Sequence, residues 1–551
     1  MIPDVLTRRA ADEPDRTAYV FLDENGAERT RLTYRELHAR ALTVAGRLAE
    51  VCAPGDRALL LFGQGPEFVV AFLGCLYAHV VAVPVNPPRR NRVQDATRAI
   101  VLDCAPAAVL TVTAMLDHVR PAVQPLVPGV HWIAVDDLSA LEFEPRPVAP
   151  DLLAFLQYTS GSTSTPKGVM VSHGNLAANQ DMIRRAFGHD RDSTVVGWAP
   201  FFHDQGLIGN VLQPLWVGAT SVQLSAMAFV RRPLLWLTTI SRYRAHTSGG
   251  PNFAFEACAA AAARGGLPDA DLSSWKVAFD GAEPVRPDTL RRFAETFAPV
   301  GFDPAALHPC YGLAEATLMV SGTGKLRGPR TVEADAAELG RRRIVAATGG
   351  KVLAGSGTPV APGAVRIVDP ESLRPCGPGD VGEIWVAGDH VAQGYWRRPE
   401  VTEETFRALL DGRPHLRTGD LGVLVDGELY VVGRLKDLVI VRGRNHYPHD
   451  IEHTVAAAHP ALRACAAFAV PAGDGERLVV VAEVRREHRD TLDTRDVLGS
   501  VRAAVLAEHE TTGEVVLTSF GRLPVTSSGK IMRAATRTRY LEGAFATEAR
   551  T

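Results

Sequence analysis

Residues 152–171 read LLAFLQYTSGSTSTPKGVMV, in which a small polar loop separates two apolar stretches. Between Tyr158 and Gly168 the loop holds six serine or threonine residues, two glycines and one lysine. Glycine lets a backbone approach an anion closely, and hydroxyl and backbone N–H groups can donate hydrogen bonds to phosphate oxygens. Lys167 adds a mobile positive charge. The stretch therefore predicts a phosphate-binding loop between two buried strands.

The loop is not a Walker A motif, which needs glycine before its lysine and serine or threonine after it. Here Pro166 and Gly168 occupy those two positions. A Walker loop also leads into a helix, whereas residues 169–171 have the apolar pattern of a strand. A flexible linker is the plain alternative, but a linker rarely joins two apolar strands.

Outward from this loop, strand-like and helix-like segments alternate. Residues 32–51 place apolar side chains at three- and four-residue spacing, which predicts an amphipathic helix. Residues 57–62 and 80–83 are short apolar runs between turn signals, as in buried strands. Because the alternation continues to about residue 300, the sequence predicts an α/β protein with parallel sheets.

The pattern changes near residue 420. Asp426-Gly427 lies between two apolar runs and predicts a β-hairpin. After Asp437 a shorter unit follows. It has predicted helices near 450–458 and 494–508 and predicted strands at 464–470 and 478–484. We therefore predict an N-terminal domain of residues 1–434, a hinge at about 434–437 and a C-terminal domain of residues 437–551.

Composition argues against several classes of protein. A chain of 551 residues is too long for a single ordinary hydrophobic core, so two or more domains are expected. The net charge of −3 does not indicate nucleic acid or an anionic membrane as a partner. Seven cysteines without a CxxC pair argue against a disulfide framework and a zinc ribbon. The N-terminus lacks a signal-peptide pattern, and the most apolar stretch, 68–83, is about one turn too short for a membrane span. That stretch predicts a buried helix running into a strand, and we expect a cytoplasmic protein without a membrane span.

Further polar motifs follow the loop along the chain. They are Gly281-Ala282-Glu283-Pro284, Tyr311-Gly312-Leu313-Ala314-Glu315, Thr418-Gly419-Asp420, Gly433-Arg434-Leu435-Lys436-Asp437 and Ser528-Gly529-Lys530. Taken singly, a tyrosine is most often a core aromatic, and a carboxylate or lysine is most often solvated. Together and in this order, the motifs resemble those of the adenylate-forming superfamily, which includes acyl-CoA synthetases, peptide-synthetase adenylation domains and luciferases.

The resemblance implies an enzyme that uses ATP and Mg²⁺ to convert a carboxylic acid to an acyl-adenylate and pyrophosphate. It also implies a large N-terminal domain that includes a β-rich subdomain, and a small, mobile α+β C-terminal domain. Lys167 and the loop residues Thr159, Ser160, Gly161, Ser162 and Thr163 are expected to hold the phosphates. The expected adenine contacts are Gly281, Ala282, Glu283, Tyr311 and Gly312, and the expected ribose contacts are Asp420 and Arg434. Glu315 is the expected magnesium ligand, Lys436 the hinge and Lys530 the catalytic lysine.

Residues 441–452, VRGRNHYPHDIE, are similar to a run of the fatty acyl-AMP ligases within this superfamily. Residues 200–207 and 247–253 also look like that branch. About forty residues separate Glu315 from the GSGTP element at 355–359, with a helix-like pattern at 332–343. The resemblance implies that about 325–355 is the insert of the ligases, which restrains the small domain and disfavours CoA. His203 is predicted to line the acyl pocket near the carboxylate.

In this branch the acyl group passes to the phosphopantetheine thiol of an acyl carrier protein. Since the chain holds no carrier domain, we expect the carrier to be a separate chain. Three alternatives stay open: a fatty acyl-CoA synthetase, an adenylation enzyme for another carboxylic acid, and a non-catalytic relative. The presence of Lys167, Glu315 and Lys530 together argues against the last of these.

Overall fold

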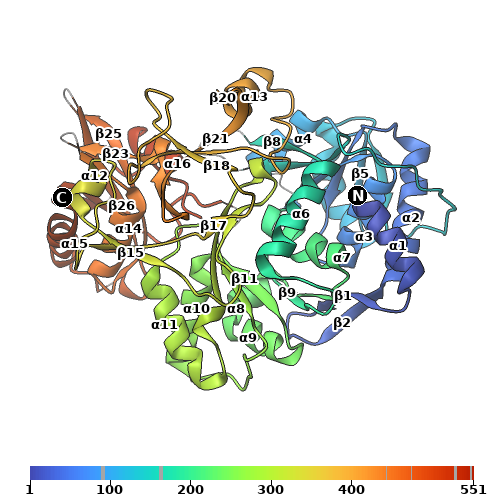
Figure 1. Ribbon diagram of the computed structural model, residues 1–551, viewed down its shortest axis with the longest axis horizontal. Helices are drawn as coiled ribbons and strands as arrows, with labels where there is room; N and C mark the ends of the chain where they lie inside the picture. The colour runs from blue at the N-terminus through green and yellow to red at the C-terminus, as the bar shows by residue number, and fades with distance from the viewer. Residues whose placement is uncertain are drawn as a thin grey trace.

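Two large sheets form the N-terminal part of the molecule, and a smaller sheet forms a lobe at the C-terminal end (Figure 1). The computed structural model describes residues 1–88, 94–159, 166–441, 444–472, 475–489, 491–526, 530–546 and 549–550. The alternation of strands and helices and the prediction of an α/β protein are confirmed.

The predicted phosphate loop joins the last two strands of a six-stranded sheet with the order β6-β5-β3-β4-β7-β8. Its strands are β3 (Arg57–Leu61), β4 (Val81–Val85), β5 (Ala108–Thr111), β6 (His131–Ala134), β7 (Leu153–Thr159) and β8 (Lys167–Ser172). All neighbours run parallel except β7 and β8, which form an antiparallel hairpin. Because both faces of the central parallel strands are covered, β3, β4 and β5 are mostly apolar, which is why the sequence shows continuous apolar runs there.

A nine-stranded sheet lies beside the first, with the order β17-β14-β13-β12-β11-β9-β10-β1-β2. Its strands are β1 (Thr17–Leu22), β2 (Glu28–Thr33), β9 (Val195–Gly197), β10 (Ser221–Gln223), β11 (Thr247–Gly250), β12 (Val277–Asp280), β13 (Leu307–Gly312), β14 (Met319–Gly322) and β17 (Thr358–Pro359). The pairs β1–β10, β10–β9, β9–β11, β11–β12 and β12–β13 are parallel. At the two ends of the sheet, β2 pairs antiparallel with β1, β14 with β13, and β17 with β14. The parallel strands bring several chain segments to one edge of the sheet.

Helices cover and connect these two sheets. They are α1 (Ile2–Asp12), α2 (Tyr34–Val51), α3 (Pro66–Tyr77), α4 (Asp95–Cys104), α5 (Thr113–Val123), α6 (His173–Phe187), α7 (Gln213–Val217), α8 (Ala226–Arg231), α9 (Pro233–Arg242), α10 (Asn252–Gly265) and α11 (Pro287–Phe297). The amphipathic helix predicted at 32–51 is α2, and the buried helix predicted at 68–83 is α3, which runs into β4. Helix α6 begins directly after β8 because Ser172 and Asn175 form a capping box.

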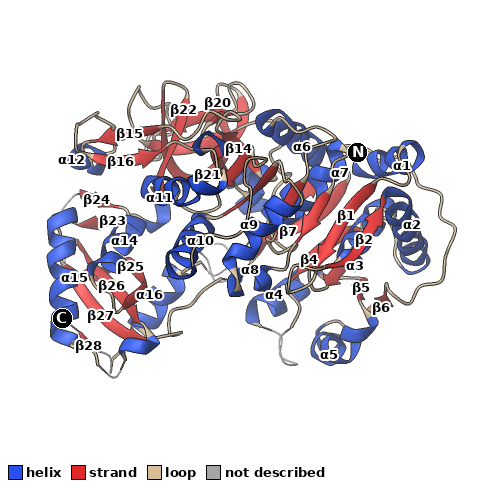
Figure 2. Cartoon of the chain, turned by 90° about the horizontal axis from the view of Figure 1, so that it is seen from below, coloured by secondary structure: helices blue, strands red, loops and turns tan. Residues whose placement is uncertain are grey.

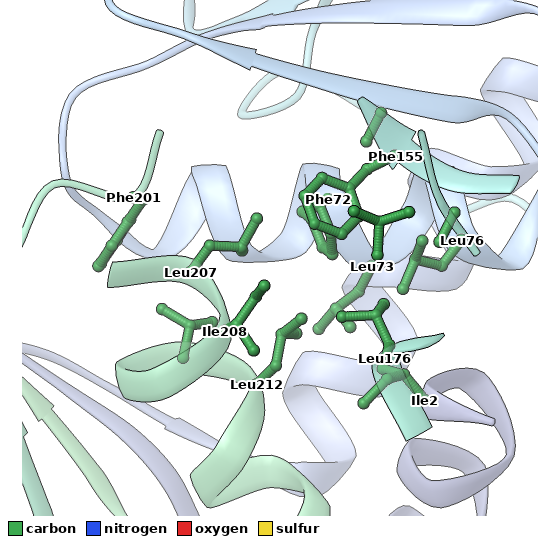
Figure 3. Packing of buried hydrophobic residues seen from close by; sticks show 14 of the residues in the cluster. Ile2, Phe72, Leu73, Leu76, Phe155, Leu176, Phe201, Leu207, Ile208 and Leu212 are labelled. Carbon is green, nitrogen blue, oxygen red and sulfur yellow. The ribbon is translucent and has the colours of Figure 1, made fainter. Parts of the chain in front are cut away.

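Figure 3 shows how the apolar side chains of α3 meet those of β7, α6 and the π-helical turn Gln205–Leu212. Phe72 and Leu73 of α3 are 1% exposed, and the rings of Phe72 and Phe155 meet edge to face with centroids 5.6 Å apart. This packing fixes the π-helical turn, which follows His203 in the chain, against the first sheet.

Replacing Leu73 by alanine should lower the free energy of unfolding by about 2–5 kcal/mol, because it leaves a cavity in this close-packed region. Denaturant unfolding followed by fluorescence measures the effect. Leu409, which is 72% exposed, provides the matched control, since its replacement by alanine is expected to change stability by about 0.5 kcal/mol or less. Equal effects at both positions would contradict the packing described here.

A β-rich region follows, with a sheet of β18 (Val365–Val368), β19 (Gly382–Val386), β20 (Ala408–Leu410), β21 (Arg413–Val425) and β22 (Glu428–Arg434). Helix α13 (Pro399–Phe406) precedes β20. The hairpin predicted around Asp426-Gly427 is β21 and β22. The predicted helix at 332–343 is wrong in part. Strand β15 (Thr331–Ala334) pairs with β16 (Lys351–Ala354), and only α12 (Ala336–Gly340) is helical. The ladder with β16 satisfies the backbone of β15, so tertiary pairing overrides the local helical pattern.

The C-terminal lobe, at the left of Figures 1 and 2, holds a four-stranded sheet of β25 (Leu462–Ala472), β26 (Gly475–Val484), β27 (Gly513–Ser519) and β28 (Ala549–Arg550). Around it lie β23 (Val439–Val441), β24 (Arg444–His446), α14 (Pro448–Ala458), α15 (Thr494–His509) and α16 (Arg533–Leu541). The predicted helices near 450–458 and 494–508 are α14 and α15. Within the described part of the chain, no helix has the length and apolar character to cross a membrane.

Candidate active site

The predicted phosphate loop lies at the turn of the β7–β8 hairpin, where Thr159 pairs with Lys167. Ser160, Gly161, Ser162 and Thr163 lie outside the described residues. Behind the turn, the Tyr158 hydroxyl donates to Asp103 Oδ2 at 2.7 Å, and a side chain at Gly168 would lie 2.9 Å from the Tyr158 ring. Glycine at 168 is thus required by close packing, and the base of the loop is held by α4.

Tyr395 connects the phosphate loop with the predicted magnesium ligand. The Lys167 ammonium lies 4.9 Å from the centroid of the Tyr395 ring, and the Tyr395 hydroxyl donates to Glu315 Oε1 at 2.8 Å. Burial raises the pKa of Glu315, and the hydrogen bond from Tyr395 acts in the opposite direction. The structure therefore brings Lys167 and Glu315, which are far apart in the sequence, to one place. Tyr395 was missed by the sequence analysis, because an isolated tyrosine carries no motif.

Tyr311, Asp420 and Arg434 form a second connected group. The Tyr311 hydroxyl donates to Asp420 Oδ2 at 2.8 Å, and Arg434 Nε donates to Asp420 Oδ1 at 2.9 Å. The turn before Asp420 is held by Glu383, a 2%-exposed carboxylate that accepts from the Gly419 backbone N–H at 3.1 Å. Glu383 also forms an ion pair with Arg417 at 2.9 Å. The motif order suggested that these elements converge, whereas the role of Glu383 in positioning the turn is visible only in the structure.

The segments of the other predicted adenine contacts are closely packed. A Cβ at Gly312 would lie 1.8 Å from the Leu318 carbonyl oxygen, so only glycine fits there. At Gly281 a Cβ would lie 2.8 Å from Cys310 Sγ. Ala282 has a φ of +67°, a conformation that is uncommon for a residue with a side chain. The Glu283 carboxylate accepts from the Phe253 backbone N–H at 2.6 Å, which ties this segment to α10.

Lys530 extends from the C-terminal lobe to the N-terminal part, where its Nζ donates to the Ala282 carbonyl oxygen. Its neighbours Ser528 and Gly529 lie outside the described residues. Desolvation where the two parts meet lowers the pKa of Lys530, while the carboxylates of Asp204 and Glu283 raise it. Burial and the charge of Lys530 lower the pKa of His203 to about 4, so its imidazole is neutral at pH 7.

The predicted hinge residue Lys436 lies in the short 3-10 turn Leu435–Asp437. Its positive charge contributes, after desolvation, to lowering the pKa of Lys167. Next to it, Asp437 accepts from Arg533 at 2.8 Å, and Arg533 also contacts both oxygens of Glu452 at 2.7 Å. The turn is thereby fastened to the C-terminal lobe.

The predicted insert contacts the C-terminal lobe. Lys351 of β16 forms an ion pair with Asp450 of α14, and Asn445 Nδ2 donates to the Gly340 carbonyl oxygen at 2.8 Å. Tyr447 is 5% exposed and packs in the same apolar cluster as Leu339 of α12. The insert and the lobe thus share a core as well as polar contacts.

Among the described residues, no group of three or more histidine, cysteine, aspartate or glutamate side chains could enclose a metal ion. Glu315 offers one carboxylate beside Lys167.

Comparison with known proteins places this site in a family. Residues 6–396 match the model of the AMP-binding enzymes, and residues 436–550 match the AMP domain of Disco-interacting protein 2-like proteins. A medium-chain-fatty-acid–[acyl-carrier-protein] ligase, JamA, from Moorena producens is 44% identical, over 98% of this chain and 95% of its own length. The long-chain-fatty-acid–AMP ligase FadD26 from Mycobacterium marinum is 41% identical, over 99% and 98%.

Solved structures agree with these matches. A fatty acid AMP ligase from Legionella pneumophila is 37% identical with a TM-score of 0.77, covering 100% of this chain and 97% of that chain. A structure from a study of fatty acyl-adenylate ligases of E. coli and L. pneumophila is 33% identical with a TM-score of 0.89, covering 99% and 98%. The chain therefore belongs to the AMP-binding enzyme family and, within it, to the fatty acyl-AMP ligases.

Proposed function

We propose that this chain uses ATP to activate a fatty acid as its acyl-adenylate and then transfers the acyl group to the phosphopantetheine thiol of a separate acyl carrier protein. The observation that carries the proposal is the position of Lys530, whose ammonium reaches Ala282 from the other lobe. The names of the relatives support the substrate, since one is called a fatty-acid–[acyl-carrier-protein] ligase and another a fatty-acid–AMP ligase.

In the proposed first step, the fatty carboxylate attacks the α-phosphorus of ATP and pyrophosphate leaves. Catalysis of this kind depends on positioning and on neutralising developing charge. Thr159 to Thr163 and Lys167 hold the β- and γ-phosphates. Lys530 bridges the carboxylate and the α-phosphate, which stabilises the transition state more than the ground state. His203, neutral beside Lys530, lines the acyl end of the site.

The remaining predicted residues hold the nucleoside. Tyr311 stacks on adenine beside Gly281, Ala282, Glu283 and Gly312. Asp420 already accepts hydrogen bonds from Tyr311 and Arg434, and with Arg434 it holds the ribose hydroxyls. The nucleoside therefore binds to side chains whose orientation is fixed before it arrives.

Mg²⁺ held by Glu315 would neutralise charge on the phosphates. We expect EDTA to abolish ATP–pyrophosphate exchange and added Mg²⁺ to restore it. A Glu315→Gln variant should need more Mg²⁺ for half-maximal exchange, because it lacks the charge of the ligand. The exposed Glu295→Gln variant is the control and should show the wild-type requirement. Exchange that persists in EDTA would contradict the need for the metal.

In the proposed second step, the C-terminal domain turns about Lys436 and withdraws Lys530, so that the carrier thiol can reach the adenylate. The insert opposes large rotations because it packs on Tyr447 and pairs Lys351 with Asp450. This restraint favours a carrier-borne thiol, which brings its own binding surface, over free CoA.

Mass spectrometry of products from a fatty-acid panel with ATP tests the proposal. We expect acyl-adenylate with fatty acids alone, and acyl thioester when a holo-carrier protein is added. Thioester formed with free CoA as fast as with the carrier would identify an acyl-CoA synthetase instead. Adenylates formed only from amino or aryl acids would identify an adenylation enzyme of another class, and no adenylate from any acid would identify a non-catalytic relative.

A further inference from the structure

Asp280 and Trp198 are two of several buried polar side chains in the N-terminal part that have no hydrogen-bond partner among the described residues. Asp280, at the end of β12, is 0% exposed and both of its carboxyl oxygens lack a donor. Trp198, just after β9, is 4% exposed and its indole N–H lacks an acceptor. By contrast, the nearby indoles of Trp236 and Trp275 both donate to Ser248. Since unpaired buried polar groups are costly and rare, this pair calls for an explanation.

The two groups lie side by side over the nine-stranded sheet. Gly250 of β11 is the partner of Asp280 in the parallel register, and paired residues on neighbouring strands, about 4.8 Å apart, face the same side. A Cβ at Gly250 would lie 2.5 Å from Trp198 Cζ2 and 3.2 Å from Trp198 Cε2, the carbon bonded to the indole nitrogen. The indole therefore occupies the space above Gly250, next to the Asp280 carboxyl group.

This pair lies close to the proposed point of reaction. Asp280 stands two residues before Ala282, whose carbonyl oxygen accepts from Lys530, so the two Cα atoms are at most about 7 Å apart. Burial raises the pKa of Asp280 well above its usual range, and the neighbouring Glu283 carboxylate adds to the effect. A carboxyl group accepts hydrogen bonds in either protonation state, and it can also donate one when it is protonated.

Two aromatic rings pack against the Trp198 side of the pair. The Trp198 ring stacks on Phe229 with centroids 4.1 Å apart and meets the ring of Phe253 at 6.0 Å. A plain alkyl chain could pack against these rings, but it would leave both polar groups unpaired. An ammonium group can only donate, so it would leave the indole N–H unpaired. A hydroxyl group can accept from the indole and donate to the carboxyl oxygen, which satisfies both at once.

We infer that Trp198 and Asp280 recognise a hydroxyl group on carbon 2 or 3 of the fatty acid, so that this chain prefers hydroxylated fatty acids to unsubstituted ones of the same length. The inference rests on the proposed function and specifies its substrate class. The position on carbon 2 or 3 follows from the short separation between Asp280 and the residue that Lys530 contacts.

Steady-state ATP–pyrophosphate exchange with matched acids tests the inference. At each chain length the wild-type chain is assayed with the unsubstituted, 2-hydroxy, 3-hydroxy and 3-amino acids. We expect kcat/KM for one of the hydroxy acids to exceed that of the unsubstituted acid by roughly 10- to 100-fold, the usual worth of a hydrogen bond to a buried polar site. The 3-amino acid should show no such advantage.

Three variants test whether Trp198 and Asp280 cause the preference for hydroxylated fatty acids. Asp280→Leu should bring the ratio of the two kcat/KM values close to one, and Trp198→Phe, which removes only the N–H and some ring area, should lower it by several fold. Asp280→Asn keeps the size and hydrogen-bonding ability of the side chain, so it should retain part of the ratio and serves as the test if the leucine variant does not fold. Asp288→Asn, the same change at an exposed position of α11, is the control.

The outcomes separate this inference from the proposed function. Activation of unsubstituted and hydroxylated acids with equal kcat/KM would overturn the inference and leave fatty-acid activation in place, as expected if a buried water satisfies the pair. A wild-type preference that Asp280→Leu and Trp198→Phe do not change would also overturn it. Failure to activate any fatty acid would instead reject the proposed function.

Discussion

Replacing Lys530 by alanine lowers fatty-acid-dependent ATP–pyrophosphate exchange by roughly 10²–10³-fold, the usual cost of losing one charge contact to the transition state. The expected effect is on turnover, because the Lys530 ammonium approaches the site from the C-terminal lobe and donates to the Ala282 carbonyl oxygen on the other side. The nucleoside residues Asp420 and Arg434 are untouched, so ATP affinity measured by calorimetry should change little.

Lys325→Ala is the control for this prediction, since Lys325 is exposed and is not among the predicted site residues. A pH profile adds a second readout. Because desolvation lowers the pKa of Lys530, its charge should be lost at a lower pH than that of an ordinary lysine, and exchange should fall on the alkaline side accordingly. Exchange by Lys530→Ala at the wild-type rate would show that another group stabilises the transition state.

Replacing Asp420 by asparagine raises the Kd for ATP by roughly 10–100-fold. The carboxylate accepts from Tyr311 at 2.8 Å and from Arg434 at 2.9 Å, and it is 6% exposed. The amide has no negative charge and only one acceptor atom, so it cannot replace both contacts and also hold a ribose hydroxyl. Titration calorimetry with ATP measures the change, and the exchange rate at saturating ATP should fall much less than the affinity.

Asp426→Asn makes the same chemical change at the exposed turn of the same hairpin, where asparagine tolerates the positive φ of 51°. It should bind ATP as the wild-type chain does. Asp420→Asn combined with Tyr311→Phe shows whether these two residues act as a unit. In that case the loss of ATP affinity in the double variant should be smaller than the sum of the two single losses. An unchanged Kd for Asp420→Asn would remove this residue from the nucleotide site.

Much of the architecture is predictable from local patterns. The apolar runs predicted as strands at 57–62 and 80–83 are β3 and β4, and the three- and four-residue spacing at 32–51 predicts α2. The loop at 158–168 was expected between two strands on the strength of its flanks, and β7 and β8 provide them. The local pattern predicts the wrong structure for residues 331–334. They form a strand, because pairing with β16 outweighs the helical pattern that begins there.

The sequence by itself determined the identity and order of the polar motifs, because each motif is a local run whose residue types limit its chemistry. Only the tertiary structure decided which residues meet. Tyr395 joins Lys167 to Glu315, and Glu383 holds the turn before Asp420. Such contacts join residues that are distant along the chain, and they depend on strand order and side-chain packing, which no short stretch of sequence encodes.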